Sequence, residues 1–126
     1  MEKRRILLVD DEETFTRSLK SYLEKTGRYD VRTESHGAEA AHMVRAFQPH
    51  LILLDVVMPD GDGGRIAAQL KADERTERIP VVFLTAVVSR EEVSAHAGRI
   101  GGQQFLAKPV SAREVLTCIE RQLEPA

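Results

Sequence analysis

Residues 51–55 read Leu51-Ile52-Leu53-Leu54-Asp55, in which four large apolar residues run directly into a carboxylate. Turn-forming residues flank the run, with Pro49 before it and Pro59 and Gly61 after it. A short, uniformly apolar run between turn signals is typical of a strand that is buried on both faces of a sheet. We therefore expect Asp55 to lie at the rim of the sheet, where the chain leaves the core.

Two further apolar runs end in polar residues in the same way. Residues 6–9 lead into Asp10 and Asp11, and residues 81–84 lead into Thr85. If all three runs are neighbouring strands of one sheet, their terminal side chains lie at a common edge.

Predicted strands and helices alternate along the whole chain. Apolar residues recur at helical spacing after each strand, and capping sequences such as Ser111-Ala112-Arg113-Glu114 mark where helices begin. The alternating pattern of residues 29–34 is typical of a half-buried strand at a sheet edge. The expected strands are 6–9, 29–34, 51–54, 81–84 and 104–107, and the expected helices are 13–25, 35–47, 62–71, one that begins at Ser89 and one that begins at Ser111.

This alternation predicts an α/β fold, a doubly wound parallel sheet of five strands with helices on both faces. The most uniformly apolar strands belong at the centre, which gives the flavodoxin-like strand order 2-1-3-4-5. The carboxyl ends of strands one and three then meet at the switch point of the sheet. Asp10, Asp11 and Asp55 should share one crevice there, with Thr85 beside them and Lys108 reaching in from strand five.

Length and composition exclude several classes of protein. The 126 residues suffice for one domain, residues 1–126, with its own core. A net charge of −2 offers no basic field for direct contact with nucleic acid, and no run approaches the roughly 18 apolar residues of a membrane span. Cys118 is the single cysteine, so no internal disulfide is possible, which fits a cytoplasmic location.

Three carboxylates, a hydroxyl group and a lysine at one edge indicate phosphoryl transfer. Close carboxylates repel one another unless a cation lies between them, and oxygen ligands suit Mg²⁺. A lysine and a hydroxyl group beside the metal can hold the equatorial oxygens of a phosphoryl group. One carboxylate then remains free to act as the nucleophile and to form an aspartyl phosphate.

The chain resembles the receiver domains of response regulators over essentially its whole length. The resemblance implies that Asp55 accepts a phosphoryl group from a phosphohistidine of a sensor histidine kinase or a histidine phosphotransfer protein. It also implies a cis peptide before Pro109. The motifs that carry it are Asp10-Asp11, Asp55-Val56-Val57-Met58-Pro59, Thr85-Ala86 and Lys108-Pro109.

The resemblance further implies a role for each neighbour of the acceptor. Asp11 would bind Mg²⁺ directly, Asp10 mainly through water and Val57 through its backbone carbonyl. Thr85 and Lys108 would bind phosphoryl oxygens. Such a domain catalyses only its own phosphorylation and dephosphorylation. It would signal to a downstream protein, or to a second copy of itself, through the face made by helix four, strand five and helix five.

Other functions fit the residues less well. A flavodoxin-like cofactor module needs a first loop that accepts a phosphate group, which Asp10 and Asp11 would repel. A dehalogenase-type phosphatase needs two aspartates one residue apart after one strand, and none are present there. The remaining alternative is a degenerate receiver that acts as a binding module without phosphorylation.

Overall fold

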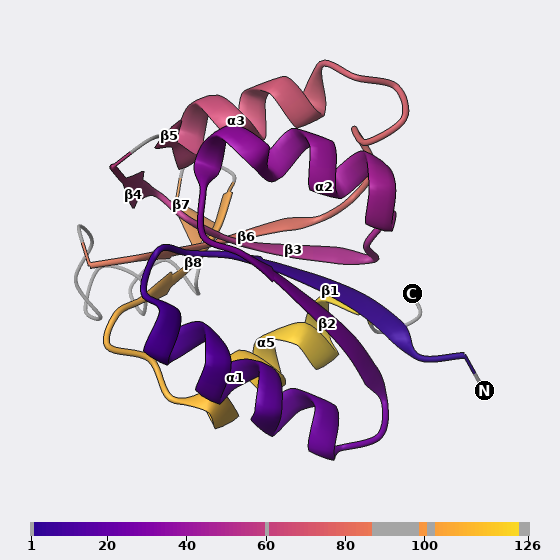
Figure 1. Ribbon diagram of the computed structural model, residues 1–126, viewed down its shortest axis with the longest axis vertical. Coiled ribbons are helices and arrows are strands. Elements are labelled where there is room, and N and C mark those ends of the chain that lie inside the picture. The colour runs from indigo at the N-terminus through magenta and orange to yellow at the C-terminus, as the bar shows by residue number, and fades with distance from the viewer. Residues whose placement is uncertain (1, 60, 87–98, 101–102, 124–126) are drawn as a thin grey trace.

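The chain is described by a computed structural model that covers residues 2–59, 61–86, 99–100 and 103–123 (Figure 1). The predicted helix that begins at Ser89 lies outside these residues. The elements are β1 (Arg4–Val9), α1 (Glu13–Lys25), β2 (Tyr29–Glu34), the 3-10 helix η1 (Gly37–Glu39), α2 (Ala40–Phe47), β3 (Leu51–Asp55), β4 (Val57–Met58), β5 (Gly61–Asp62), α3 (Gly63–Lys71), β6 (Val81–Thr85), β7 (Arg99–Ile100), β8 (Gln103–Ala107) and α5 (Ala112–Leu123).

The predicted doubly wound α/β fold is confirmed. The sheet has the order β2-β1-β3-β6-β8-β7, and its first five strands are parallel. The order differs from the predicted 2-1-3-4-5 in one detail, because β7 pairs antiparallel with β8 as a sixth strand. A strand of two residues is too short to give an apolar pattern, so the sequence could not predict it.

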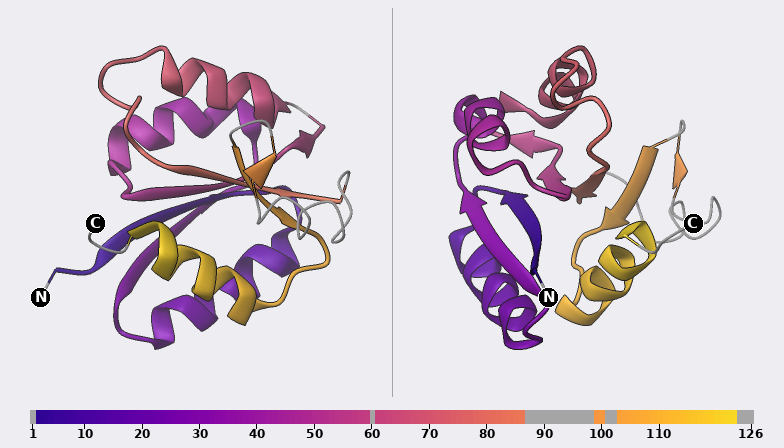
Figure 2. Two further views of the ribbon diagram at one scale, coloured as in Figure 1. Left: turned by 180° about the vertical axis from the view of Figure 1, so that it is seen from behind. Right: turned by 90° about the vertical axis from the view of Figure 1, so that its right-hand side faces the viewer.

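Helices cover both faces of the sheet and create two cores. Figure 1 shows α2 and α3 above the sheet and α1 and α5 below it, and Figure 2 shows the same layers from behind. Because side chains alternate along a strand, Ile6 and Leu8 of β1 face the α1 and α5 side, whereas Leu7 and Val9 face α2 and α3. The central strands are therefore buried on both faces, as predicted.

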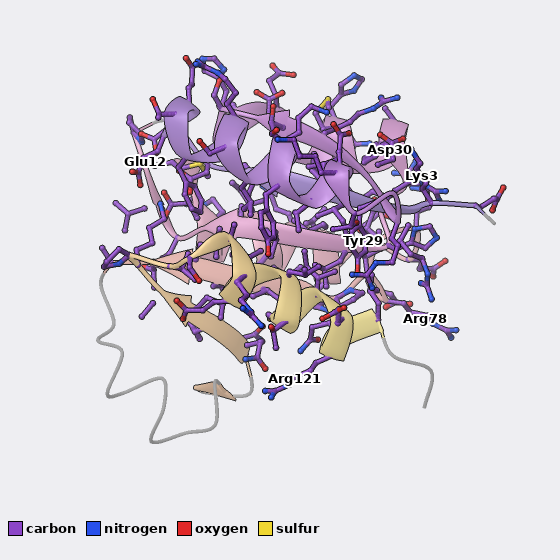
Figure 3. All side chains as sticks on the ribbon, turned by 90° about the horizontal axis from the view of Figure 1, so that it is seen from below. Lys3, Glu12, Tyr29, Asp30, Arg78 and Arg121 are labelled. Carbon is purple, nitrogen blue, oxygen red and sulfur yellow. The ribbon has the colours of Figure 1, made fainter. Side chains whose placement is uncertain are left out.

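The lower core fixes α5 against the sheet. Val115, Cys118 and Ile119 are buried there, and Leu116 and Leu123 of the same helix are partly buried against this core. Seen from below, α1 and α5 lie side by side (Figure 3). Burial raises the pKa of the Cys118 thiol to about 11, and this thiol is therefore neutral at ordinary pH.

Two local details differ from the predicted elements. The helix expected over residues 35–47 begins as the 3-10 turn η1 and becomes α-helical only at Ala40. Gly37 lies in that first turn, and glycine disfavours a regular α-helix. Thr33 of β2 is exposed although it follows the apolar face of that strand, because β2 is an edge strand. No described helix is both long and apolar enough to span a membrane.

Candidate functional site

The acidic cluster lies at the carboxyl ends of two central strands. Asp10 directly follows β1, and Asp55 is the last residue of β3. Carboxylate oxygens of Asp10, Asp11 and Asp55 all lie within 4.8 Å of one another. Asp10 is fully buried and Asp55 almost so, whereas Asp11 is exposed. The fold thus brings together the three acids that are predicted to share one crevice.

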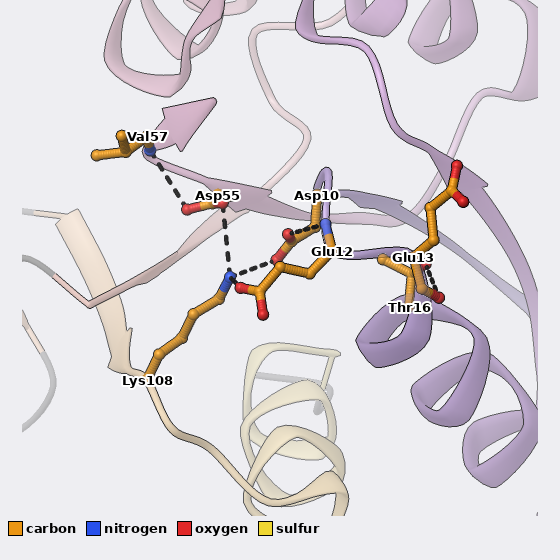
Figure 4. Close-up of polar contacts among 7 residues, drawn as sticks. All are labelled: Asp10, Glu12, Glu13, Thr16, Asp55, Val57 and Lys108. Atoms are coloured by element: carbon orange, nitrogen blue, oxygen red, sulfur yellow. Dashed lines mark hydrogen bonds and ion pairs between the residues drawn. The ribbon is translucent and has the colours of Figure 1, made fainter. Parts of the chain in front are cut away.

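Lys108 reaches this cluster from the end of β8. Its backbone N–H donates to the carbonyl of Thr85 at 2.8 Å, which ties the end of β8 to β6. Its ammonium Nζ lies 2.7 Å from Asp10 Oδ2 and 3.5 Å from Asp55 Oδ2 (Figure 4). The Lys108–Pro109 peptide is cis, as the resemblance implies. The ammonium therefore supplies a positive charge between two buried carboxylates.

Two residues at the start of α1, Glu12 and Phe15, also contact Lys108, and the sequence patterns predict neither contact. Glu12 Oε1 lies 2.6 Å from the ammonium Nζ, and the ring centroid of Phe15 lies 5.3 Å from it, within cation–π range. The Glu12 N–H donates to Asp10 Oδ1 at 3.0 Å. The available signal was the third acid after Asp10 and Asp11, but acids at a helix start are also favoured by the helix dipole.

Thr85 completes the edge from β6. It is the last residue of that strand, is 1% exposed, and pairs in register with Ala107 of β8. One residue earlier, Leu84 pairs with Asp55. Thr85 therefore ends the strand next to the one that carries Asp55, at the same edge of the sheet.

The loop after Asp55 is held by backbone contacts. The Val57 N–H donates to Asp55 Oδ1 at 3.3 Å, and β4 then pairs antiparallel with β5. At the start of α3, the Gly63 N–H donates to the Val56 carbonyl at 2.9 Å. A Cβ atom on Gly63 would lie only 2.8 Å from Val56 Cα. Only glycine therefore fits at this position without a shift of the loop that follows Asp55.

Asp55 and Lys108 both have perturbed pKa values, and each contributes to the shift of the other. Burial raises the pKa of Asp55, the neighbouring Asp10 carboxylate raises it further, and the Lys108 ammonium and the Val57 N–H only partly oppose this. Burial favours the neutral amine of Lys108, but the Asp10 and Glu12 carboxylates outweigh it and raise the pKa of Lys108 above its usual value. Lys108 therefore stays charged, while the charged form of Asp55 is disfavoured.

We expect Asp55→Asn to raise the thermal midpoint of the metal-free protein at neutral pH, because it removes that disfavoured charge. The raised pKa means that the folded state binds the Asp55 proton more tightly than the unfolded chain does. The stabilising contribution of this group is therefore present at low pH and is lost as the pH rises through the folded pKa. The difference between variant and wild type should therefore shrink as the pH falls.

Thermal melts in a chelator across a pH series measure this difference. The control is Asp30→Asn, which removes an exposed carboxylate of β2 and should show no such pH-dependent gain. A gain for Asp55→Asn that is the same at every pH would contradict the expectation.

The donor set fits a hard divalent cation. Asp10 Oδ2 is buried, lies 2.7 Å from the Lys108 ammonium as an ion pair, and has no hydrogen-bond partner among the described groups. Buried carboxylate oxygens rarely lack one, and a metal ion or its water would satisfy this atom. The cluster is acidic and offers only oxygen ligands, which is compatible with Mg²⁺.

Comparison with known proteins identifies the family. Residues 6–120 match the response regulator receiver domain, and the chain therefore belongs to this family of two-component signalling modules. It is 34% identical to Protein PilH of Pseudomonas aeruginosa over 94% of this chain and 97% of that protein. The receiver domain of HemR from Leptospira biflexa has 32% identity and a TM-score of 0.79, covering 98% of this chain and 97% of that one.

Other relatives are longer than this chain. The transcriptional regulatory protein GltR of Pseudomonas aeruginosa is 35% identical over 98% of this chain, but the match covers only 50% of GltR. The chain thus spans about half the length of several curated relatives that it matches.

Proposed function

We propose that this chain is a phosphoacceptor receiver in which Asp55 takes a phosphoryl group from the phosphohistidine of a sensor histidine kinase or a histidine phosphotransfer protein. One observation supports this most strongly: the buried carboxylate of Asp55 lies within reach both of the Asp10 and Asp11 carboxylates, a pair suited to a metal ion, and of the Lys108 ammonium. In the transfer, an Asp55 oxygen forms a bond to phosphorus, and the phosphorus–nitrogen bond of the phosphohistidine breaks with its electron pair on the imidazole.

The surrounding residues have separate roles in this proposal. Asp10, Asp11, Asp55 and the backbone carbonyl of Val57 would hold Mg²⁺. When bound, the ion would neutralise charge on the phosphoryl oxygens. The Val57 N–H donates to Asp55 Oδ1, which holds the carboxylate in orientation. Asp55 Oδ2 faces Lys108, and we assign it as the attacking oxygen.

Lys108 and Thr85 would stabilise the transferred group. The Lys108 ammonium lies 3.5 Å from Asp55 Oδ2, so it is close enough to bind an oxygen of a phosphoryl group on that atom. Thr85 ends the neighbouring strand, which suits its hydroxyl to a second oxygen. Fixed donors of this kind stabilise the charge that spreads over the equatorial oxygens.

The proposed switch would act by rearranging the surface that contacts a downstream partner. We place residues 1–126 in one receiver domain in the cytoplasm, with the face around helix four, β8 and α5 as the contact for a downstream protein or a second copy. Phe105 of β8 stacks on Phe83 with ring centroids 5.1 Å apart. This ring couples β8 to β6, whose end carries Thr85, and supports a path from the site to that face.

We expect acetyl phosphate with Mg²⁺ to phosphorylate the wild type at Asp55 and to leave Asp55→Asn unlabelled. The reason is that the amide of asparagine is not a nucleophile for phosphorus. Intact-mass spectrometry measures the added group, and peptide mapping after borohydride reduction locates it. A chelator should prevent labelling of the wild type.

The matched control for this experiment is Asp30→Asn, which should label like the wild type. Full labelling of Asp55→Asn at another carboxylate would show that the acceptor is assigned wrongly. No labelling of the folded wild type by acetyl phosphate, or by any phosphohistidine donor, would favour the degenerate receiver that acts only as a binding module.

A further inference from the structure

The Lys108 ammonium is held more closely by the start of α1 than by Asp55. Its distance to Glu12 Oε1 is 2.6 Å, against 3.5 Å to Asp55 Oδ2. Phe15 lies one helical turn after Glu12 and places its ring 5.3 Å from the same ammonium. Figure 4 shows the lysine side chain extending between Asp55 and the Glu12 carboxylate. The Lys108 ammonium thus contacts a carboxylate on each side of the crevice, Asp55 on one side and Glu12 on the other.

We propose that Glu12 is a positioning residue for Lys108. In the metal-free, unphosphorylated state, Glu12 holds the Lys108 ammonium at the start of α1. This inference rests on the proposed function, since it concerns the lysine that would bind the phosphoryl group on Asp55. The ion pair with Glu12 competes with that contact. Glu12 therefore lowers the affinity of the site for a phosphoryl group by stabilising the lysine elsewhere.

Exposure distinguishes Glu12 from the other carboxylates that contact Lys108. The Glu12 side chain is 60% exposed, whereas that of Asp10 is fully buried. A metal ion at the acid pair, or a water bound to it, would engage Asp10, and the ammonium would then lose that partner. Glu12 lies outside the set of predicted metal ligands and stays available, so it is the carboxylate that continues to compete for Lys108 when the metal is bound.

The test measures binding of beryllofluoride, a mimic of the phosphoryl group, by calorimetry at saturating Mg²⁺. We expect Glu12→Gln to bind it about threefold more tightly than the wild type, the scale of an ion pair with one exposed partner. Glu13→Gln is the matched control, because it removes the same charge from the next residue, whose carboxylate points away from Lys108 (Figure 4). It should bind like the wild type.

A double-mutant cycle separates an effect through the lysine from an effect of charge alone. In a Lys108→Ala background, Glu12→Gln should no longer change the affinity for beryllofluoride. The proposal would be overturned if Glu12→Gln raised the affinity for beryllofluoride equally in the Lys108→Ala background, or if it did not raise that affinity in the protein that retains Lys108. If the wild type bound no beryllofluoride in Mg²⁺, the proposed function itself would fail.

The Lys108 ammonium also gives a direct readout that does not depend on the alanine variant. Its ¹⁵Nζ resonance in the metal-free protein should shift in Glu12→Gln and stay in place in Glu13→Gln. An unchanged resonance in Glu12→Gln would overturn the proposal even if the affinity changed, because the ion pair would then be absent in solution.

Discussion

Replacing Lys108 with methionine should lower the free energy of unfolding of the metal-free protein at neutral pH by about 3 kcal/mol. Methionine keeps most of the length and apolar contact of the lysine stem but removes the ammonium. Asp10 and Asp55 then face each other without the cation that lies 2.7 Å and 3.5 Å from their oxygens. Removing one partner of a buried ion pair leaves uncompensated charge, which is the costly change.

Magnesium should reverse much of this loss, because the bound ion replaces the missing positive charge. Chemical denaturation with and without Mg²⁺ measures both parts of the expectation. The control is Lys25→Met in the last turn of α1, an exposed lysine whose replacement should change the unfolding free energy by less than about 0.5 kcal/mol. A Lys108→Met variant as stable as the wild type in a chelator would show that the ammonium does not neutralise the cluster.

Gly63→Ala should have the second large effect, with a loss of about 2 kcal/mol in stability from the added carbon. The new Cβ would lie 2.8 Å from Val56 Cα and closer still to the Asp55 carbonyl, and these are backbone atoms that cannot rotate away. Relief of the clash moves the loop that carries Asp55. Labelling by acetyl phosphate should therefore slow about tenfold, since small misplacements of reacting groups are costly.

Gly64→Ala is the neighbouring control, because Gly64 is exposed in the same turn of α3. It should keep both the stability and the labelling rate close to those of the wild type. Equal rates for Gly63→Ala and wild type would mean that the loop tolerates the shift and that its position does not limit the chemistry.

The sequence was sufficient to predict the acid cluster because strand ends follow from short-range patterns. Each apolar run is bounded by a change in polarity, and parallel topology then carries Asp10 and Asp55 to one edge. Thr85 and Lys108 were predicted for the same reason. The cis peptide before Pro109 came from the resemblance and not from the pattern.

The contacts of Glu12, Phe15 and Gly63 could not be predicted in this way. Each depends on how a helix start is oriented against a strand end, which local periodicity does not encode. The contact of Lys108 with Glu12 joins residues far apart in sequence and depends on the direction of two long side chains. Likewise, the tight space at Gly63 arises from the path of the Asp55 loop, although a glycine near a turn has several ordinary explanations.

The burial of Cys118 makes its rate of chemical modification a measure of local opening of the structure. Its thiol is the only one in the chain, is packed in the core beside Val115 and Ile119, and is protonated at ordinary pH. Thiolate is the reactive form, so a thiol reagent should modify Cys118 mainly when α5 separates from the sheet. The rate of modification therefore reports how often α5 opens in this way. Because the native thiol reacts slowly, cysteines introduced at exposed positions can carry spectroscopic probes without its removal.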